Sequence, residues 1–386
     1  MERTLHPAPL RPPIAVVPGL VAAQVVLPCA DLAATLAWFT DQLGFRVEVI
    51  SPADDPSVVV IAGLGVRLRL ERSDADGASS TPACAPALVL TCNDPSVVRE
   101  TELVAPNGTR VLLVPADPPL DIPPVQQSFV LSRAADSSTF HQGRAGMGYR
   151  DLVPDRQGGR FIASHILIDD EGPVPDYVHF HQVRFQMIFV ARGWVELVYE
   201  DQGEPFVMYA GDCVLQPPTI RHRVLRSSAG LEVVELGCPA IHDTFADPTM
   251  SLPTHRLLPT RPYGNRHTGT QRFVRHVASN ATWHPHRPGF EQRDTGIGGA
   301  TDGVAGARVF RPITGDVTTI APAATMTHDG ELMFWFVLGG SVRLEVDGRE
   351  PIDLVERDSV VLPQQTPFRF CEPTTDLEVL EVTLPA

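Results

Sequence analysis

The chain has 386 residues, which is too long for one ordinary domain and predicts two or three. Apolar residues make up 43% and charged residues 20%, so the composition supports packed cores and excludes global disorder. A formal net charge of −15 repels phosphate backbones and anionic lipid, so we expect neither a nucleic-acid partner nor a membrane partner.

The first residues predict a tail over 1–19 and no targeting signal, because Pro12, Pro13 and Pro18 interrupt the apolar run that follows an acidic Glu2. No run of about 18 apolar residues is present to cross a bilayer. Six cysteines lack C-x-x-C spacing, which argues against a disulfide framework or a zinc knuckle. They are Cys29, Cys84, Cys92, Cys213, Cys238 and Cys371. We therefore expect a cytoplasmic location.

Residues 31–45 predict the first helix. Large apolar residues recur at 32, 36, 39 and 43, and Asp31 stands at the N-cap position. Strand-like runs follow as "FRVEVI", "SVVVIAG", "VRLRLER", "ALVLTC" and "NGTRVLLVP". A proline-rich stretch near residue 124 ends this part of the chain.

This order of elements, with its "D-L...W-F...L-G-F" signature, resembles the glyoxalase/bleomycin-resistance (vicinal oxygen chelate) superfamily over roughly residues 20–116. The resemblance implies a small α+β domain at residues 20–124. It places Gln24 at one metal-ligand position but Leu112 where the family has a glutamate. Because a site without that carboxylate holds a divalent ion weakly, we expect a degenerate, metal-free module that has a structural or dimerising role, and a homodimer is one expected assembly.

From about residue 140 the sequence repeats itself after roughly 145 residues, and each copy contains many short β-branched runs. Three sets of matching positions mark the repeat. They are Arg150-Asp151 with Arg293-Asp294, Gly193 with Gly340, and Pro217 with Pro363. The pattern predicts two β-sandwich barrels fused in one chain.

The stretch "VHFHQVRFQMIFVARG", residues 178–193, carries the strongest chemical signal. His179 and His181 are two apart, so on a strand they face the same side. A short turn brings Gln186 to the same interior, and His222, in "GDCVLQPPTIRH", is expected to return at the end of a following strand. Burying these groups in an apolar barrel without a shared partner is costly, which favours a metal site over satisfied core histidines.

This spacing resembles the two signature motifs of the cupin superfamily. The resemblance implies a mainly β fold with two tandem jelly-roll barrels, over residues 140–255 and 256–386. Residue by residue, it implies that His179, His181, Gln186 and His222 bind one divalent metal ion per chain. Imidazole ligands suit several metals; we favour Fe(II), with Zn, Ni or Mn as alternatives.

The second copy is expected to be metal-free and to pack against the first. The positions that align with the ligands hold a single imidazole, and the others look like core filling. These positions are Met326, His328, Met333 and Phe368.

Candidate substrate-binding groups surround the first motif. They are Arg150, Arg160, Arg184, Gln216 and Arg221. An apolar aromatic lining is expected from Phe180, Phe185, Phe189 and Trp194. Tyr199 and Glu200 are expected on the surface of a hairpin.

Three functions fit these features. The first is a mononuclear non-haem iron oxygenase that acts on a small oxygen-chelating metabolite, as open metal sites in the resembled superfamily often do. The second, suggested by the neutral Gln186, is a redox-neutral metal-dependent isomerase, epimerase or lyase acting on a keto acid or sugar-like substrate. The third is a small-molecule-binding protein without catalysis.

Overall fold

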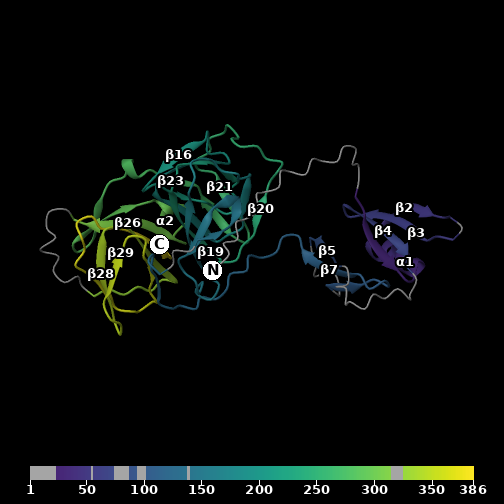
Figure 1. Cartoon of the computed structure of the whole chain (residues 1–386), viewed down its shortest axis with the longest axis horizontal. Helices are drawn as coiled ribbons and strands as arrows, with labels where there is room; N and C mark the ends of the chain where they lie inside the picture. The colour runs from purple at the N-terminus through teal and green to yellow at the C-terminus, as the bar shows by residue number, and fades with distance from the viewer. Residues whose placement is uncertain (1–22, 54, 74–86, 94–100, 137–139, 314–324) are drawn as a thin grey trace, which may run out of the picture. The chain divides into compact units, whose positions relative to one another are not determined.

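A computed structural model describes residues 23–53, 55–73, 87–93, 101–136, 140–313 and 325–386 (Figure 1). The chain is mainly β, and its contacts divide it into two units, Met1–Pro118 and Pro119–Ala386. The predicted tail and Cys84 lie outside the described residues, and the five described cysteines are free. Among the described elements, no helix combines the length and apolar composition needed to cross a bilayer.

The first unit contains the predicted helix, α1 (Leu32–Leu43). Asp31 caps it, because the side chain accepts a hydrogen bond from the Ala34 amide at 2.9 Å. Gly44 ends it at φ 70°, a conformation that favours glycine. Phe39 is buried and packs with the first sheet. The helix prediction is confirmed.

Two small sheets complete this unit. One has the order β1-β4-β3-β2, in which β1 runs parallel to β4, and the other has the order β5-β7-β6. Their bounds are β1 (Val25–Cys29), β2 (Arg46–Ser51), β3 (Val58–Gly63), β4 (Val66–Arg72), β5 (Ala87–Cys92), β6 (Glu102–Val104) and β7 (Arg110–Pro115). Gln24 is exposed just before β1, and Leu112 is half-buried on β7.

The first half of the second unit contains a seven-stranded sheet and a smaller one. The large sheet has the order β23-β17-β14-β19-β11-β10-β9, and the small sheet β16-β15-β18-β13-β20, with β12 paired to β18. The bounds are β9 (His141–Gln142), β10 (Gly148–Asp151), β11 (Ile162–Ile168), β12 (Gly172–Pro173), β13 (His179–His181), β14 (Phe185–Arg192), β15 (Trp194–Tyr199), β16 (Phe206–Tyr209), β17 (Cys213–Leu215), β18 (His222–Ser227), β19 (Leu231–Cys238), β20 (Thr244–Ala246) and β23 (Val274–His276).

The second half repeats this arrangement after a hairpin, β21 (Pro262–Asn265) and β22 (Gly269–Arg272), and includes the short helix α2 (Ile297–Ala300). Its large sheet has the order β24-β25-β26-β32-β27-β30-β8, and its small sheet β29-β28-β31. The bounds are β8 (Val130–Ser132), β24 (His284–Arg287), β25 (Phe290–Asp294), β26 (Gly306–Pro312), β27 (Leu332–Gly339), β28 (Ser341–Val346), β29 (Ile352–Val355), β30 (Ser359–Val361), β31 (Phe368–Cys371) and β32 (Glu378–Leu384).

The matching strand orders agree with the internal repeat. The agreement extends to single pairs, because His179 faces His222 across β13 and β18, and Met326 faces Phe368 at the corresponding place. The assignment of each half as a jelly roll stays a prediction.

The two halves exchange edge strands. β8, which precedes the first half, pairs with β30 of the second half. β23, which opens the second half, pairs with β17 of the first half. Each half thereby covers a sheet edge of the other that would otherwise expose unpaired backbone groups.

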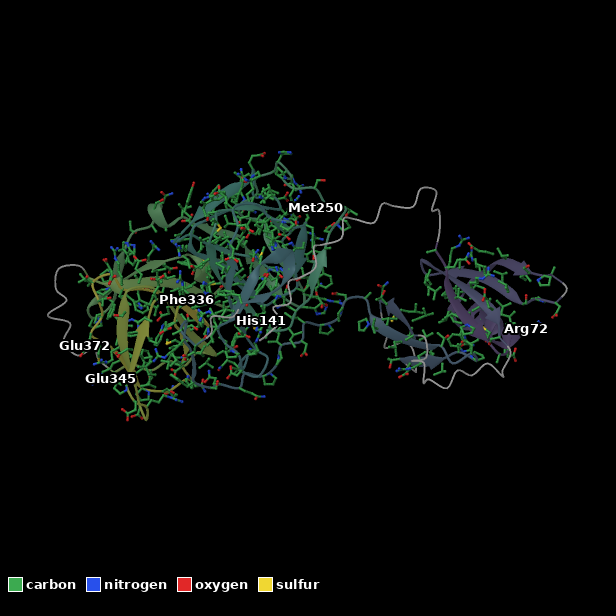
Figure 2. All side chains as sticks on the ribbon, viewed as in Figure 1. Arg72, His141, Met250, Phe336, Glu345 and Glu372 are labelled. Carbon is green, nitrogen blue, oxygen red and sulfur yellow. The ribbon has the colours of Figure 1, made fainter. Side chains whose placement is uncertain are left out.

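The large sheets of the two halves pack face to face. Phe185, Met187 and Phe189 of β14 and Phe334 and Phe336 of β27 belong to one buried cluster (Phe336 is labelled in Figure 2). Residues between them in sequence face the opposite way because side chains alternate along a strand. Ile188 and Val190, for example, pack with the small sheet inside the first half. The interior that holds the site therefore lies between the large and the small sheet of the first half. The second half covers the opposite face of that large sheet.

Candidate metal centre

Three imidazoles meet inside the first half. His179 and His181 come from β13 and His222 from the start of β18, and each offers a ring nitrogen within 4.8 Å of the others. The ring centroids of His179 and His222 are 4.2 Å apart, and those of His179 and His181 are 5.3 Å apart. The prediction that these three side chains share one interior is confirmed.

One nitrogen of each ring is held from outside the cluster. His179 Nδ1 lies 2.8 Å from the carbonyl oxygen of Tyr177, and His222 Nδ1 lies 3.1 Å from that of Ile220. His181 Nδ1 lies 3.3 Å from the Thr244 hydroxyl. These contacts fix ring orientation and leave each Nε2 available, as the outer hydrogen bonds of metal-bound histidines do.

Within the cluster, His179 Nε2 is a buried polar atom that the described residues leave unsatisfied, without a hydrogen-bond partner. An unpaired buried polar atom costs roughly 1–3 kcal/mol, so a folded chain rarely keeps one without a reason. A metal ion bound by the three imidazoles satisfies it, and the donor set therefore fits a divalent transition metal.

Burial keeps the three rings neutral, which is the form that binds metal. Burial, with the neighbouring His242 and His179, lowers the pKa of His181 to about 3. Burial lowers the pKa of His222 well below its usual value, and burial together with Arg144 lowers that of His179.

A buried carboxylate, Asp176, lies behind the cluster. It forms an ion pair with Arg144, and it accepts hydrogen bonds from the Tyr177 and Val224 amides, each at 2.9 Å. One of its oxygens is 3.7 Å from His179 Nδ1. Neither Asp176 nor Arg144 was predicted from the sequence, because Asp176 stands in a loop and Arg144 in a short 3-10 turn, both outside the motif.

Gln186 faces the same interior from β14 and is buried. Its amide nitrogen donates to Glu235 of β19 at 2.5 Å, so the amide oxygen is the atom left for a metal. Its role as fourth ligand stays a prediction. Glu235 lines the cavity beside the histidines and was missed, because it shares the strand "LEVVELGC" with a second glutamate, Glu232, and with no other metal-ligating residue type of the motif.

A cavity of about 80 Å³ adjoins His181 and His222. Its wall is mostly apolar, with Ile166, Ile188 and Leu197 among the lining residues. The polar side chains that face it are Arg144, Tyr149, Tyr199, Gln216, Arg223 and Glu235. Gln216 is the one predicted substrate residue that lines this cavity.

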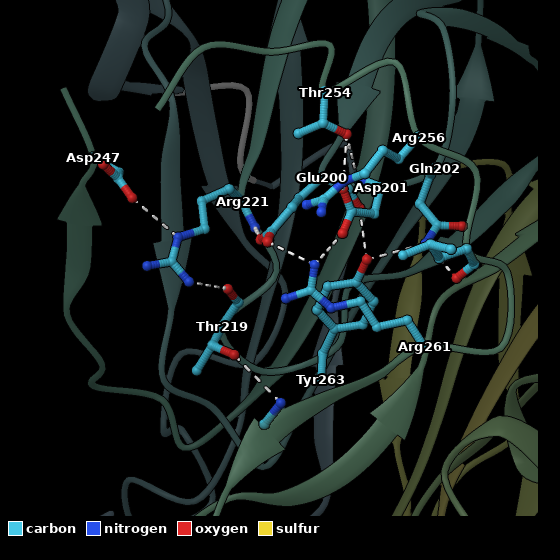
Figure 3. Close-up of polar contacts among 12 residues, drawn as sticks. Glu200, Asp201, Gln202, Thr219, Arg221, Asp247, Thr254, Arg256, Arg261 and Tyr263 are labelled. Carbon is cyan, nitrogen blue, oxygen red and sulfur yellow. Dashed lines mark hydrogen bonds and ion pairs between the residues drawn. The ribbon is translucent and has the colours of Figure 1, made fainter. Parts of the chain in front are cut away.

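Tyr199 and Glu200 contradict the expectation of a hairpin surface. The Tyr199 ring is fully buried and stacks on His222, with centroids 5.4 Å apart, and burial raises its pKa. Glu200 is buried and accepts a hydrogen bond from Arg261 at 2.8 Å (Figure 3). The expectation was wrong because the loop that follows β20 covers this end of β15.

The structure places the predicted arginines away from the cavity. Arg150 is buried on the opposite face of β10 from Tyr149, and it donates to the Arg357 carbonyl of the second half at 2.7 Å. Arg160 and Arg184 both form ion pairs with Glu331. These three side chains connect the two halves of the unit.

Arg221 stands directly before β18 and is held by hydrogen bonds to neighbouring loops. Its Nε donates to Asp247 at 3.1 Å and its Nη1 to the Thr219 carbonyl at 3.2 Å, as Figure 3 shows. Its guanidinium lies 4.2 Å from the centroid of the Phe180 ring. None of these four arginines lines the cavity. That any of them binds a substrate stays a prediction.

The predicted aromatic lining is wrong. Phe185 and Phe189 are fully buried between the two large sheets, and Phe180 stacks on Phe245. The prediction failed because β14 is buried on both faces, so its pattern does not tell which face looks inward. The inward residue is Ile188.

No protein-family model and no curated protein matches the chain. Several solved structures are similar to it in fold. Protein Ylba from E. coli is 12% identical with a TM-score of 0.47, over 70% of this chain and 96% of that one. Salicylate 1,2-dioxygenase from Pseudaminobacter salicylatoxidans is 15% identical with a TM-score of 0.48, over 68% of this chain and 86% of that one.

Proposed function

We propose that the first half binds one divalent metal ion, Fe(II) by preference, and acts as a mononuclear non-haem oxygenase on a small anionic metabolite. The observation that carries the metal is the buried, unpartnered Nε2 of His179 within a cluster of three neutral imidazoles. His179, His181 and His222 would hold the ion, with the Gln186 amide oxygen as a fourth ligand. A metal with few protein ligands supplies open positions for a chelating substrate and for oxygen.

Two arginines favour an anionic substrate. Arg144 and Arg223 both line the cavity, and Arg223 Nε is buried without a hydrogen-bond partner among the described residues. The neutral imidazoles add no negative charge; Glu235 also lines the cavity, and Asp176 pairs with Arg144. We therefore propose that the two guanidiniums orient a carboxylate while the apolar wall excludes water.

Oxygen uptake by anaerobically purified protein reconstituted with Fe(II) tests this proposal. Small hydroxylated aromatic acids and keto acids form the substrate panel, because both combine a carboxylate with a second chelating oxygen. We expect uptake that requires Fe(II) and is lost in His222→Ala. Turnover that continues unchanged without oxygen contradicts the oxygenase assignment.

A second function is favoured by Glu235. Its carboxylate lines the cavity, accepts a hydrogen bond from Gln186, and is placed to move a proton on a metal-polarised carbonyl compound. A redox-neutral isomerase or lyase is therefore the alternative. It predicts product formation under nitrogen with Zn or Mn in place of Fe, abolished by Glu235→Gln.

A further inference from the structure

The second half contains a cleft of about 460 Å³ between β24, β26, β27 and β32. It occupies the place that the metal cluster has in the first half. Met326, Met333 and Phe368 line it, where His179, Gln186 and His222 stand in the other copy. The sequence predicted only a packing role for this half, and a packing role does not require such an opening.

Three buried polar atoms of the residues that line this cleft have no hydrogen-bond partner within the described parts of the chain: Arg287 Nε, His328 Nδ1 and Thr383 Oγ1. His328 Nε2 lies 2.9 Å from the Leu362 carbonyl oxygen, which only accepts, so Nε2 carries the ring proton. His328 Nδ1 is therefore an acceptor, while Arg287 Nε is a donor. The residues of the cleft therefore include an unpartnered donor, Arg287 Nε, and an unpartnered acceptor, His328 Nδ1.

The charged side chains of the cleft are two arginines, Arg287 and Arg308, and two carboxylates, Glu381 and Asp329. Buried Glu381 accepts hydrogen bonds from Arg287 Nη2 at 2.6 Å and Trp335 Nε1 at 2.8 Å, and Arg308 Nε lies 3.4 Å away. Two guanidiniums thus face one buried carboxylate. Asp329, at the exposed rim, is hydrogen-bonded to Gln365.

We propose that this cleft is a second ligand site, independent of the metal, for a small carboxylate that carries a neighbouring hydroxyl or ammonium group. Its carboxylate binds Arg287 and Thr383, and its hydroxyl or ammonium donates to His328 Nδ1. The carbon skeleton of the ligand contacts Phe368 and the two methionines, Met326 and Met333. Methionine side chains suit this role because they are flexible and adapt to irregular shapes.

Saturation-transfer NMR on the full-length chain tests the site, with lactate and serine as probes and acetate as the probe that lacks the donor group. We expect signal from lactate or serine and little from acetate. Thr383→Val and His328→Phe should each weaken binding about tenfold, since each removes one hydrogen bond to a charged or polar ligand. Thr270→Val, an exposed threonine on β22, is the matched control and should change nothing.

The His179→Ala background separates this site from the metal centre. Binding that persists there while metal is lost supports the proposal whatever the first half catalyses. The proposal is overturned if neither lactate nor serine gives a signal, if binding disappears with His179→Ala, or if correctly folded Thr383→Val and His328→Phe bind as the unmodified chain does. Thermal unfolding of each variant establishes that it is folded.

Discussion

At the scale of single residues, the three histidines are positioned both by one another and by the groups around the cluster, such as backbone carbonyls and Tyr199. His222 pairs directly with His179 across two strands and stacks on Tyr199, so it joins the histidine cluster to the core. We expect His222→Ala to reduce bound metal from about one equivalent per chain to a small fraction, because affinity follows ligand count. Elemental analysis after anaerobic purification measures this. His328→Ala in the second half is the control and should retain the metal.

Asp176 should act on the metal through His179 rather than by direct contact. Its negative charge lies 3.7 Å from His179 Nδ1, and two backbone amides hold it in place. Asp176→Asn keeps the shape and removes the charge, and we expect a loss of metal affinity of about 10–100-fold. Competition with a chromogenic chelator measures this. Equal affinity in Asp176→Asn and in the exposed control Asp170→Asn would show that the charge is not involved.

At the scale of elements, Glu232 of β19 binds Arg357 of the second half and His165 of β11. Burial opposes its ionisation, but hydrogen bonds from His165 and Arg357 prevail and lower the pKa of Glu232 from 4.5 to about 2. Its contribution to stability is therefore present above about pH 4.5 and is lost as the pH falls toward 2.

Glu232→Gln tests this contribution. Removing one partner of a buried ion pair costs about 3 kcal/mol, so we expect a lower free energy of unfolding at pH 7 by about that amount. The difference between variant and parent should shrink as the pH falls from 5 to 3. Urea unfolding at several pH values measures both effects, and a difference that is constant with pH contradicts the assignment.

Much of this architecture could be predicted from sequence where the signal is local. Helix α1 follows from its cap and apolar spacing, and the inward pair His179 and His181 follows from strand alternation. The exchange of β8 and β23 could not be predicted, because pairing between distant segments leaves no local pattern. Glu235 was missed because its strand also carries Glu232, and nothing in the sequence tells which of the two faces the histidines. The side of the sheet to which Phe185 points could not be predicted, because both faces of β14 are buried.

At the scale of the whole molecule, the two units have separate cores, which predicts that residues 119–386 fold alone. We expect this fragment to bind one metal ion and to unfold at the same urea concentration as it does within the full chain. Residues 119–255 should not fold stably, because they lack β23 and the face of the second half. Circular dichroism and elemental analysis of both fragments check this, and a stable, metal-binding 119–255 fragment would contradict it.

The exchanged strands also constrain the order of events during synthesis on the ribosome. The β8 segment leaves the ribosome early, but its partner strand is made much later, as the sequence separation of 225 between Arg133 and its ion-pair partner Asp358 indicates. The first half, in turn, stays open along β17 until β23 has been translated. The first half therefore cannot close the β17 edge before part of the second half has been made, and a translation product that ends before β23 should be recognised by chaperones or proteases.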